Sequence, residues 1–307
     1  MERQSLKRLH ACIESVIKGK SDAVRMAIIT LLGRGHLLLE DVPGIGKTTL
    51  AFTLAKATNC SFQRMQFTSD LLPTDIIGVN IYNPDTKEFE FKPGPLFANI
   101  ILADEINRTN PKTQSALLEA MNERRVSVDR RTYRLPEPFM VIATQNPLEY
   151  HGTFPLPESQ LDRFMMHLKL GYPAPEYERN ILVHQASFDS IESMEPAISS
   201  EEIIRMQQEV DAVRIDDSLV DYIMTVISHT RRSDKIRLGV SPRGGQFLLK
   251  AARATAYYEG RGYVVPDDIK GAAPLVFGHR IILKAQTYIA DAERIITEIM
   301  SEIPVPV

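Results

Sequence analysis

The sequence predicts an α/β fold, with a parallel sheet flanked by helices, followed by an all-helical second domain. Up to about residue 172, short β-type runs alternate with helical patterns, which is typical of a parallel sheet. After Gly171 the pattern changes, because Pro173 and Pro175 mark a boundary and the following segments are helical with almost no strands. We therefore predict two domains, residues 1–172 and residues 173–307.

The bulk composition favours a soluble globular protein. The 307 residues are enough for two hydrophobic cores, and no apolar run approaches the roughly 20 residues of a membrane helix. The N-terminal segment lacks the apolar run of a secretory signal, so we expect a cytoplasmic protein with no membrane insertion. Cys12 and Cys60 give neither a disulfide framework nor a zinc set. A formal net charge of −3 argues against a chain committed to polyanions such as nucleic acid, although a local patch could still bind one.

The first domain contains runs with the composition of strands. They are residues 36–40, 62–66, 99–103, 139–144 and 166–170. Between the third and fourth runs, residues 111–123 predict a helix, with Asn110 as its N-cap and a proline at its first position. Leu117, Ala120 and Met121 fall on one face of this helix.

Two hairpin-like inserts interrupt this alternation. In residues 81–91 the turn Asn83-Pro84-Asp85 separates β-type residues, and residues 126–135 read VSV, then DRR, then TYRL. The second insert carries or adjoins Arg124, Arg125, Arg130, Arg131 and Arg134.

The second domain is predicted from helical periodicity and capping signals. Ser199, followed by Glu202, makes a capping box before a helix over residues 203–213. A helix that begins at Ser241-Pro242 runs to about Tyr258. Between these two helices, one apolar face is formed by Leu219, Val220, Ile223, Met224 and Ile227.

The stretch EDVPGIGKTTL fits a phosphate-binding loop at all but one position, because Asp41 stands where the usual pattern has its first glycine. The stretch follows a short apolar strand and leads into a helix, the setting of a phosphate loop, although an ordinary strand-to-helix turn is the alternative. Gly44 and Gly46 would let backbone N–H groups approach phosphates at the helix N-terminus. Lys47 would reach the β- and γ-phosphates, and Thr48 would offer its hydroxyl to Mg²⁺. The predicted binding residues of the loop are Pro43, Gly44, Ile45, Gly46, Lys47, Thr48 and Thr49.

Polar side chains end two of the predicted strands. IILADE is an apolar strand that ends in two acids, and carboxylates at the carboxyl end of a strand lie beside the ligand crevice of an open α/β sheet. Asp104 would help to hold Mg²⁺, and Glu105 would polarise the attacking water. Asn146, after the next strand, would hold water or the γ-phosphate as a sensor. The alternatives are a strand that ends in two solvated acids and an ordinary Asn-Pro turn.

These motifs, in their order, resemble the MoxR family of AAA+ ATPases over essentially the whole chain. The stretches that carry the resemblance are EDVPGIGKT, FTSDLLPTDIIGVNIYNP, FKPGPLFANIILADEINR, KTQSALLEAMNE, ATQNPLEYHGTFPLPESQLDRF and SPRGGQFLLKAARA. The resemblance implies an AAA+ P-loop NTPase core followed by an α-helical lid, with ATP bound between them and at the boundary of adjacent subunits of a ring. The first loop glycine is often absent in this family, so Asp41 is a tolerated variation there.

The resemblance assigns roles to further residues. Arg163, in LDRF, aligns with the arginine finger that points into the neighbouring subunit's ATP site, where such a residue can raise the rate roughly 10³- to 10⁵-fold. Arg243, in SPRGG, aligns with the lid's sensor arginine, which contacts the γ-phosphate. Without the family match, each would be interpreted as a surface arginine at a helix start. Ile17 begins IKGK, which resembles the family's adenine-contacting segment, usually Ile-Gly-Gln.

The resemblance also implies a function and partners. We expect a chaperone-like, hexameric ATPase that uses ATP and Mg²⁺ to remodel or activate a protein client, together with a von Willebrand factor A domain protein. Both hairpin inserts would face the pore or the upper surface of the ring. Because a similar hairpin touches DNA in related ring motors, a nucleic-acid motor is one alternative, and a magnesium-chelatase-like motor subunit is another.

Overall fold

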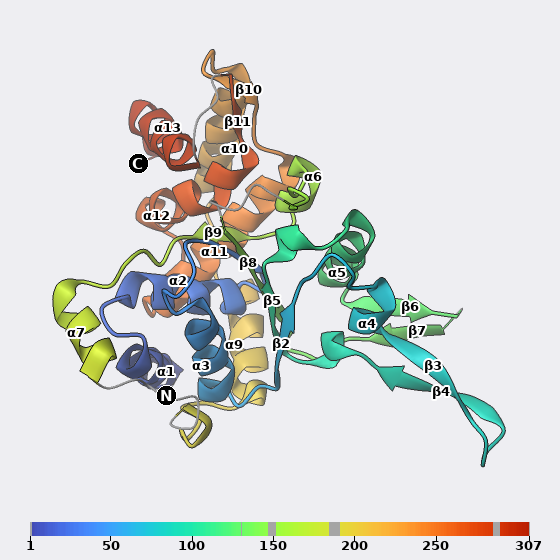
Figure 1. Ribbon diagram of the computed structural model, residues 1–307. Helices are drawn as coiled ribbons and strands as arrows, with labels where there is room; N and C mark the ends of the chain where they lie inside the picture. Colours follow the sequence, from blue (N-terminus) through green and yellow to red (C-terminus); the bar gives the residue numbers. More distant parts are fainter. Residues whose placement is uncertain (1, 130, 147–151, 184–190, 285–288, 307) are drawn as a thin grey trace.

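The computed structural model describes residues 2–306 apart from residues 130, 147–151, 184–190 and 285–288. Its first part is a sheet with helices on both faces, and its last part is mainly helical, with the helices of residues 217–232, 266–277 and 289–302 drawn at the top of Figure 1. Among the described residues, no helix is long and apolar enough to cross a bilayer.

A five-stranded parallel sheet, in the order β2-β5-β8-β1-β9, forms the centre of the first part. Its strands are β1 (Leu37–Glu40), β2 (Phe62–Gln66), β5 (Ile100–Asp104), β8 (Met140–Gln145) and β9 (Met166–Leu168). Each predicted strand is confirmed to within two residues at either end. Because the strands are parallel, their carboxyl ends lie at one edge, where Glu40 is opposite Gln145 and Gln66 is opposite Asp104.

Strand β5 shows how the layers are held together. The helices of this part are α1 (Glu2–Val16), α2 (Ser21–Leu32), α3 (Lys47–Ala57), α4 (Pro73–Ile77), α5 (Pro111–Glu123) and α6 (Glu158–Leu161). Ile100 and Leu102 belong to a hydrophobic cluster with residues of α1, α2 and α3, whereas Ile101 and Ala103 belong to a second cluster with residues of α5. The pleat of a strand turns successive side chains to opposite faces, so the apolar run of β5 stabilises both layers. Figure 1 shows α3 and α5 on opposite sides of the sheet.

Helix α5 has the predicted bounds. The Asn110 side chain accepts hydrogen bonds from the N–H groups of the second and third helical residues, at 3.1 Å each. Leu117, Ala120 and Met121 are buried, as their spacing predicts. An N-cap of this kind stabilises a helix by about 1 kcal/mol, and the buried face orients the helix on the sheet.

Both predicted hairpins are confirmed. Their strands are β3 (Gly78–Asn83) with β4 (Glu88–Pro93), and β6 (Arg125–Val128) with β7 (Arg131–Arg134). The ring of Phe91 stacks on that of Tyr133 with centroids 4.1 Å apart, which joins one hairpin to the other. The first hairpin projects from the body as an arm (Figure 1). Arg130, another of the predicted arginines, lies outside the described residues.

The helical part follows β9. Its elements are α7 (Pro175–Val183), α9 (Ser200–Ala212), α10 (Asp217–Arg232), β10 (Ile236–Leu238), α11 (Pro242–Tyr258), α12 (Pro266–Phe277), β11 (Ile282–Leu283) and α13 (Ile289–Glu302). The capping box of Ser199 and Glu202 is confirmed, and so is the start of α11 after its N-cap Ser241. One hydrophobic cluster runs from the sheet into this part, so a division at residues 172 and 173 stays a prediction.

The predicted apolar face of α10 is wrong at two positions. Met224 is 55% exposed and Val220 is half-buried, whereas Tyr222 and Val226 are buried with Leu219. The buried positions of this helix recur every three or four residues. At about 100° per residue, Met224 lies roughly 140° around the helix from Leu219, outside the buried stripe.

A buried arginine fastens the helical part to the segment that precedes β9. Arg280 follows α12 and is 6% exposed. Its Nε donates to Asp162 Oδ1 at 2.9 Å, and Nη1 donates to the carbonyl oxygen of Met165 at 3.3 Å. Ser241, the N-cap of α11, also donates its hydroxyl to the Asp162 carboxylate. A buried cation needs such a carboxylate partner, so Asp162 links two helices to the sheet.

Candidate active site

The loop between β1 and α3 holds its two glycines in conformations that other residues avoid. Gly44 has a φ angle of +86° and Gly46 has one of +97°. A Cβ atom at either position would meet nothing within 4 Å, so the backbone conformation rather than crowding requires glycine. Gly46 precedes α3 without a side-chain cap, so an anion at this helix end would supply the missing acceptor.

Lys47 is the first residue of α3 and is half-buried, as are Thr48 and Thr49 after it. Its Nζ donates a hydrogen bond to the backbone oxygen of Asp41, 2.6 Å away. Burial lowers the pKa of Lys47, and the negative charges of Asp104, Asp41 and Glu105 oppose this lowering. The ammonium group therefore lies within the field of the acids that end β5.

Asp104, the last residue of β5, is held from both sides. Its Oδ1 accepts a hydrogen bond from the Thr144 hydroxyl of β8 at 2.7 Å. Its Oδ2 accepts from Arg64 of β2, at 2.7 Å from Nη2 and 3.2 Å from Nε. The neighbours of β5 on either side thus orient the carboxylate at the edge of the sheet.

Glu105 is the first residue after β5 and has a φ angle of +56°, which is rare for a residue with a side chain. Its N–H donates to the Thr144 hydroxyl at 2.9 Å. Its Oε2 accepts from Gln66 Nε2 at 2.7 Å and from Arg108 Nη1 at 3.0 Å. An unusual backbone conformation that the surroundings enforce is found most often at functional sites.

The partners of the two acids are not predicted from the sequence; they are Arg64, Gln66, Arg108 and Thr144. Arg64 and Gln66 are two residues apart, so both point to the same side of β2. One signal was visible, because β2 reads FQRMQ and a strand in a parallel sheet is usually apolar. That these side chains contact the two acids could not be predicted, because the pairing of β2 with β5 is known only from the fold.

Asn146 follows β8 directly and is 6% exposed. Because β8 lies between β5 and β1, this residue leaves the sheet between the acids and the loop. The structure therefore brings Lys47, Asp104, Glu105 and Asn146 to one edge, as predicted.

The two predicted arginines lie elsewhere on the chain. Arg163 Nη1 donates to the carbonyl oxygen of Leu118 in α5, at 2.6 Å. Arg243 is in the first turn of α11, and its Nη1 is 3.9 Å from Asp162 Oδ2. Asp162 thus precedes Arg163 in the sequence and forms an ion pair with Arg243.

The predicted adenine segment lies beside the connection between the two parts. Ile17 is buried after α1. Gly19 has a φ angle of +71°, and a Cβ atom there would lie 2.4 Å from the ring of Tyr177 in α7. Lys20 Nζ donates to the carbonyl oxygen of Tyr172 at 2.7 Å.

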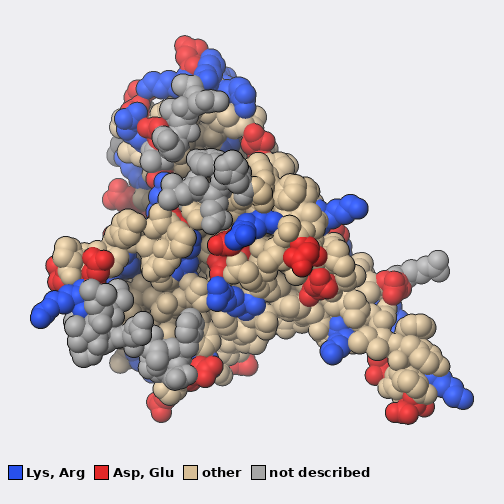
Figure 2. All heavy atoms as spheres, viewed as in Figure 1, with Lys and Arg blue, Asp and Glu red and all other residues tan. Residues whose placement is uncertain are grey.

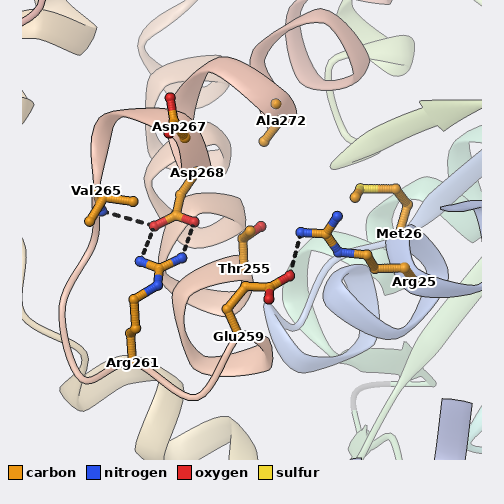
Figure 3. A pocket seen from close by; sticks show the side chains of 10 residues that line it. Arg25, Met26, Thr255, Glu259, Arg261, Val265, Asp267, Asp268 and Ala272 are labelled. Atoms are coloured by element: carbon orange, nitrogen blue, oxygen red, sulfur yellow. Dashed lines mark hydrogen bonds and ion pairs between the residues drawn. The ribbon is translucent and has the colours of Figure 1, made fainter. Parts of the chain in front are cut away.

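A separate cavity of about 560 Å³ lies among α2, α11 and α12 (Figure 3). Arg25 pairs with Glu259 at 2.7 Å, and Arg261 pairs with Asp268 at 2.6 Å. These charges neutralise each other, and no residue of the glycine loop lines the cavity. It therefore adds nothing to the site at the sheet edge.

Comparison with known proteins agrees with this geometry. Residues 36–166 match the family described as "ATPase family associated with various cellular activities (AAA)", and residues 228–299 match the "AAA lid domain". The chain is 41% identical over 308 residues to Chaperone MoxR1 of Mycobacterium tuberculosis, an alignment that covers 97% of this chain and 80% of the relative. The chain belongs to the MoxR family of AAA+ ATPases.

Two further similarities span the chain. It is 52% identical over 297 residues to the uncharacterized protein YeaC of Bacillus subtilis, with coverage of 96% of this chain and 93% of that one. A crystal structure of a candidate ATPase from Cytophaga hutchinsonii is similar with a TM-score of 0.90 at 39% identity, and covers 100% of this chain and 96% of that one. The expected core and helical lid are confirmed, and this MoxR-family chain is an ATPase.

The contact of Gln66 with Glu105 leads to a first prediction. In Gln66→Ala the Glu105 carboxylate loses a hydrogen-bond donor, which leaves Oε2 freer to accept a proton from the attacking water, so we expect basal ATP turnover to rise about threefold. Steady-state phosphate release measures this. Gln63→Ala is the matched control, because Gln63 is exposed on the same strand with its side chain on the other face. Turnover that stays unchanged or falls in Gln66→Ala would show that Gln66 does not restrain Glu105.

Proposed function

We propose that the chain binds ATP with Mg²⁺ at the glycine loop and hydrolyses it within a ring of identical subunits, in the cytoplasm, to remodel or activate a protein client. The observation that supports this most strongly is the convergence of Lys47 with Asp104 and Glu105 at one edge of the sheet, with Thr144 holding both acids. A module that only bound nucleotide would need no such second acid beside the first.

The residues at the loop suit a nucleotide and its metal ion. Lys47 already donates to a backbone oxygen, so it can exchange that acceptor for phosphate oxygens. Thr48 and Asp104 would hold Mg²⁺, which neutralises phosphate charge when bound. No group of three or more His, Cys, Asp or Glu residues arranged to hold a metal ion is found in the described part of the chain.

Glu105 and Asn146 would act on the attacking water. The Glu105 carboxylate can accept its proton, provided that Gln66 or Arg108 yields one of the oxygen's hydrogen bonds. Asn146 can donate to one group and accept from another without adding charge. Attack would be in line with the leaving β-phosphate oxygen.

A ring would complete the site in trans. Arg163 donates to an oxygen of its own α5, and its buried Nε has no hydrogen-bond partner among the described residues, so part of its donor capacity is unused. We propose that it stabilises charge on the γ-phosphate in the neighbouring subunit of a hexamer. Arg243 would contact the γ-phosphate and so couple nucleotide binding to the position of the lid. Asp162 lies between the two arginines and would couple the contact made by Arg163 to the position of Arg243.

The arm formed by β3 and β4 favours a protein client. Its Ile81, Tyr82 and Phe89 side chains are 48%, 49% and 68% exposed. Figure 2 shows mostly uncharged surface along this arm, with acids and bases mixed near its tip. Exposed apolar groups of this kind mark protein contacts. A partner with a von Willebrand factor A domain would bring clients to this surface.

The first test of this proposal removes the base. Glu105→Gln keeps the size of the side chain but cannot take a proton, so we expect turnover to fall by about 10²- to 10³-fold while ATP binding persists. Glu119→Gln, at an exposed position of α5, is the control. Full turnover in Glu105→Gln would exclude Glu105 as the base. The same variant, loaded with ATP, would hold a client for capture from cell extract.

The second test asks whether Arg163 acts in trans. Arg163→Ala subunits should bind ATP without turnover, and Lys47→Ala subunits should lack turnover because they lose the phosphate contact. In a mixture, an Arg163→Ala site can receive Arg163 from a Lys47→Ala neighbour, so part of the ATPase activity should return. Absence of rescue at every mixing ratio would contradict a trans role.

A nucleic-acid motor is the second candidate, because Arg125, Arg131 and Arg134 are exposed on the second hairpin. Such a motor would bind oligonucleotides with an affinity that falls steeply as salt rises, and DNA would stimulate its ATPase. If neither effect is measured, this candidate is excluded. A chelatase-like motor would instead be stimulated only by its chelatase partners and a porphyrin substrate.

A further inference from the structure

Asp41 occupies the loop position where the usual phosphate-loop pattern has glycine, and every polar group of its backbone is engaged. Its N–H donates to the carbonyl oxygen of Gln145 at 3.3 Å, and its own carbonyl oxygen accepts from Lys47 Nζ at 2.6 Å. These two contacts need no side chain, so a glycine could make both.

The carboxylate of Asp41 does something that a glycine could not. Its Oδ2 accepts hydrogen bonds from the N–H groups of Leu170 and Gly171, the latter at 3.2 Å. Hydrogen bonds from N–H groups to a charged acceptor are stronger than those between neutral groups. The phosphate loop is therefore fastened to the chain just beyond β9.

Leu170 and Gly171 begin the connection to the helical lid. Gly171 has a φ angle of +63°, so the chain turns sharply there. The next carbonyl oxygen, that of Tyr172, accepts from Lys20 beside the predicted adenine segment. The two halves of the expected nucleotide site thus hold three consecutive residues between them, Leu170 and Gly171 through Asp41 and Tyr172 through Lys20.

The residue before Asp41 strengthens this link. Glu40 Oε2 is 2.9 Å from Nε2 of the buried His167 on β9, and His167 Nδ1 is 3.5 Å from Glu293 Oε1 on α13 of the lid. Two consecutive carboxylates at the end of β1 therefore hold β9 and its extension. The side chain of His167 connects one of them onward to the lid.

We propose that Asp41 is a positioning residue, whose carboxylate ties the phosphate loop to the start of the lid connection and so couples phosphate binding to the position of the lid. The proposal rests on the proposed function, since it assumes that Lys47 leaves the Asp41 carbonyl for phosphate. When Lys47 turns away, the loop segment that carries Asp41 is released on one side. Leu170 and Gly171, which the Asp41 carboxylate holds, then move with the loop.

The two interpretations of Asp41 predict different effects of placing a glycine at this position. If Asp41 is only a tolerated variation, Asp41→Gly restores the pattern and leaves turnover unchanged or higher. If it is a positioning residue, Asp41→Gly lowers turnover although the loop then matches the pattern fully. Asp41→Asn keeps an oxygen acceptor in place and should restore most of the activity.

The experiment uses the full chain and three readouts. These are the Kd of a fluorescent ATP analogue, the kcat of ATP hydrolysis, and amide hydrogen exchange in a peptide that spans residues 168–173, with and without a non-hydrolysable ATP analogue. Asp234→Gly is the matched control, because Asp234 is exposed in a turn of the helical part, outside the proposed sites.

For Asp41→Gly we expect a Kd within about threefold of the unaltered chain, exchange at Leu170 and Gly171 faster by about tenfold, and kcat lower by about tenfold, because hydrogen bonds to a charged group are lost. Nucleotide should no longer change the exchange of this peptide. Asp41→Asn should lie within about threefold of the unaltered chain in every readout, which also separates the role of the acceptor from a failure to fold.

Three results would overturn the inference. Unchanged exchange and turnover in Asp41→Gly would make Asp41 a tolerated variation, while the proposed function would stand. Faster exchange with a normal kcat and a normal response to nucleotide would reduce the contact to a structural one. If the unaltered chain binds no ATP analogue, the proposed function fails and the coupling fails with it.

Discussion

The hydroxyl of Thr144 fixes the two acids on which the site depends. It donates to Asp104 Oδ1 at 2.7 Å and accepts from the N–H of Glu105 at 2.9 Å. Because Thr144 belongs to β8 and the acids end β5, both contacts require the parallel register that places Ala103 opposite Ala143. Thr144 is fully buried, so the packing of the sheet and the placement of the acids depend on one side chain.

In this structure the acids and the loop lysine are engaged within the chain itself. Arg64 donates a hydrogen bond to Asp104. Both Gln66 and Arg108 donate to Glu105, and Lys47 donates to a backbone oxygen of the loop. A nucleotide would exchange some of these contacts, so part of its binding free energy would go into rearranging the edge of the sheet. The links through Asp41 and Asp162 give that rearrangement two routes to the lid.

Local signals in the sequence predicted much of this fold. Buried strands, an N-cap such as Asn110 and glycines that need a positive φ are determined by neighbouring residues, so they could be found without the fold. The outward turn of Met224 was missed because apolar residues at the edge of a helical stripe look like core residues. Gln66 and Asp41 were missed as functional partners for another reason. Their contacts join segments 39 and 129 residues apart, and only strand order brings these together.

The central claim is that Thr144 aligns both acids for hydrolysis, and the ATPase activity of Thr144→Val tests it most directly. Valine has the shape of threonine without the hydroxyl, so the sheet should keep its packing while Asp104 and Glu105 lose their shared contact. We predict a near-normal Kd for ATP with kcat lower by about 100-fold, since small displacements of catalytic groups have effects of that size. A kcat equal to that of the unaltered chain would contradict the account.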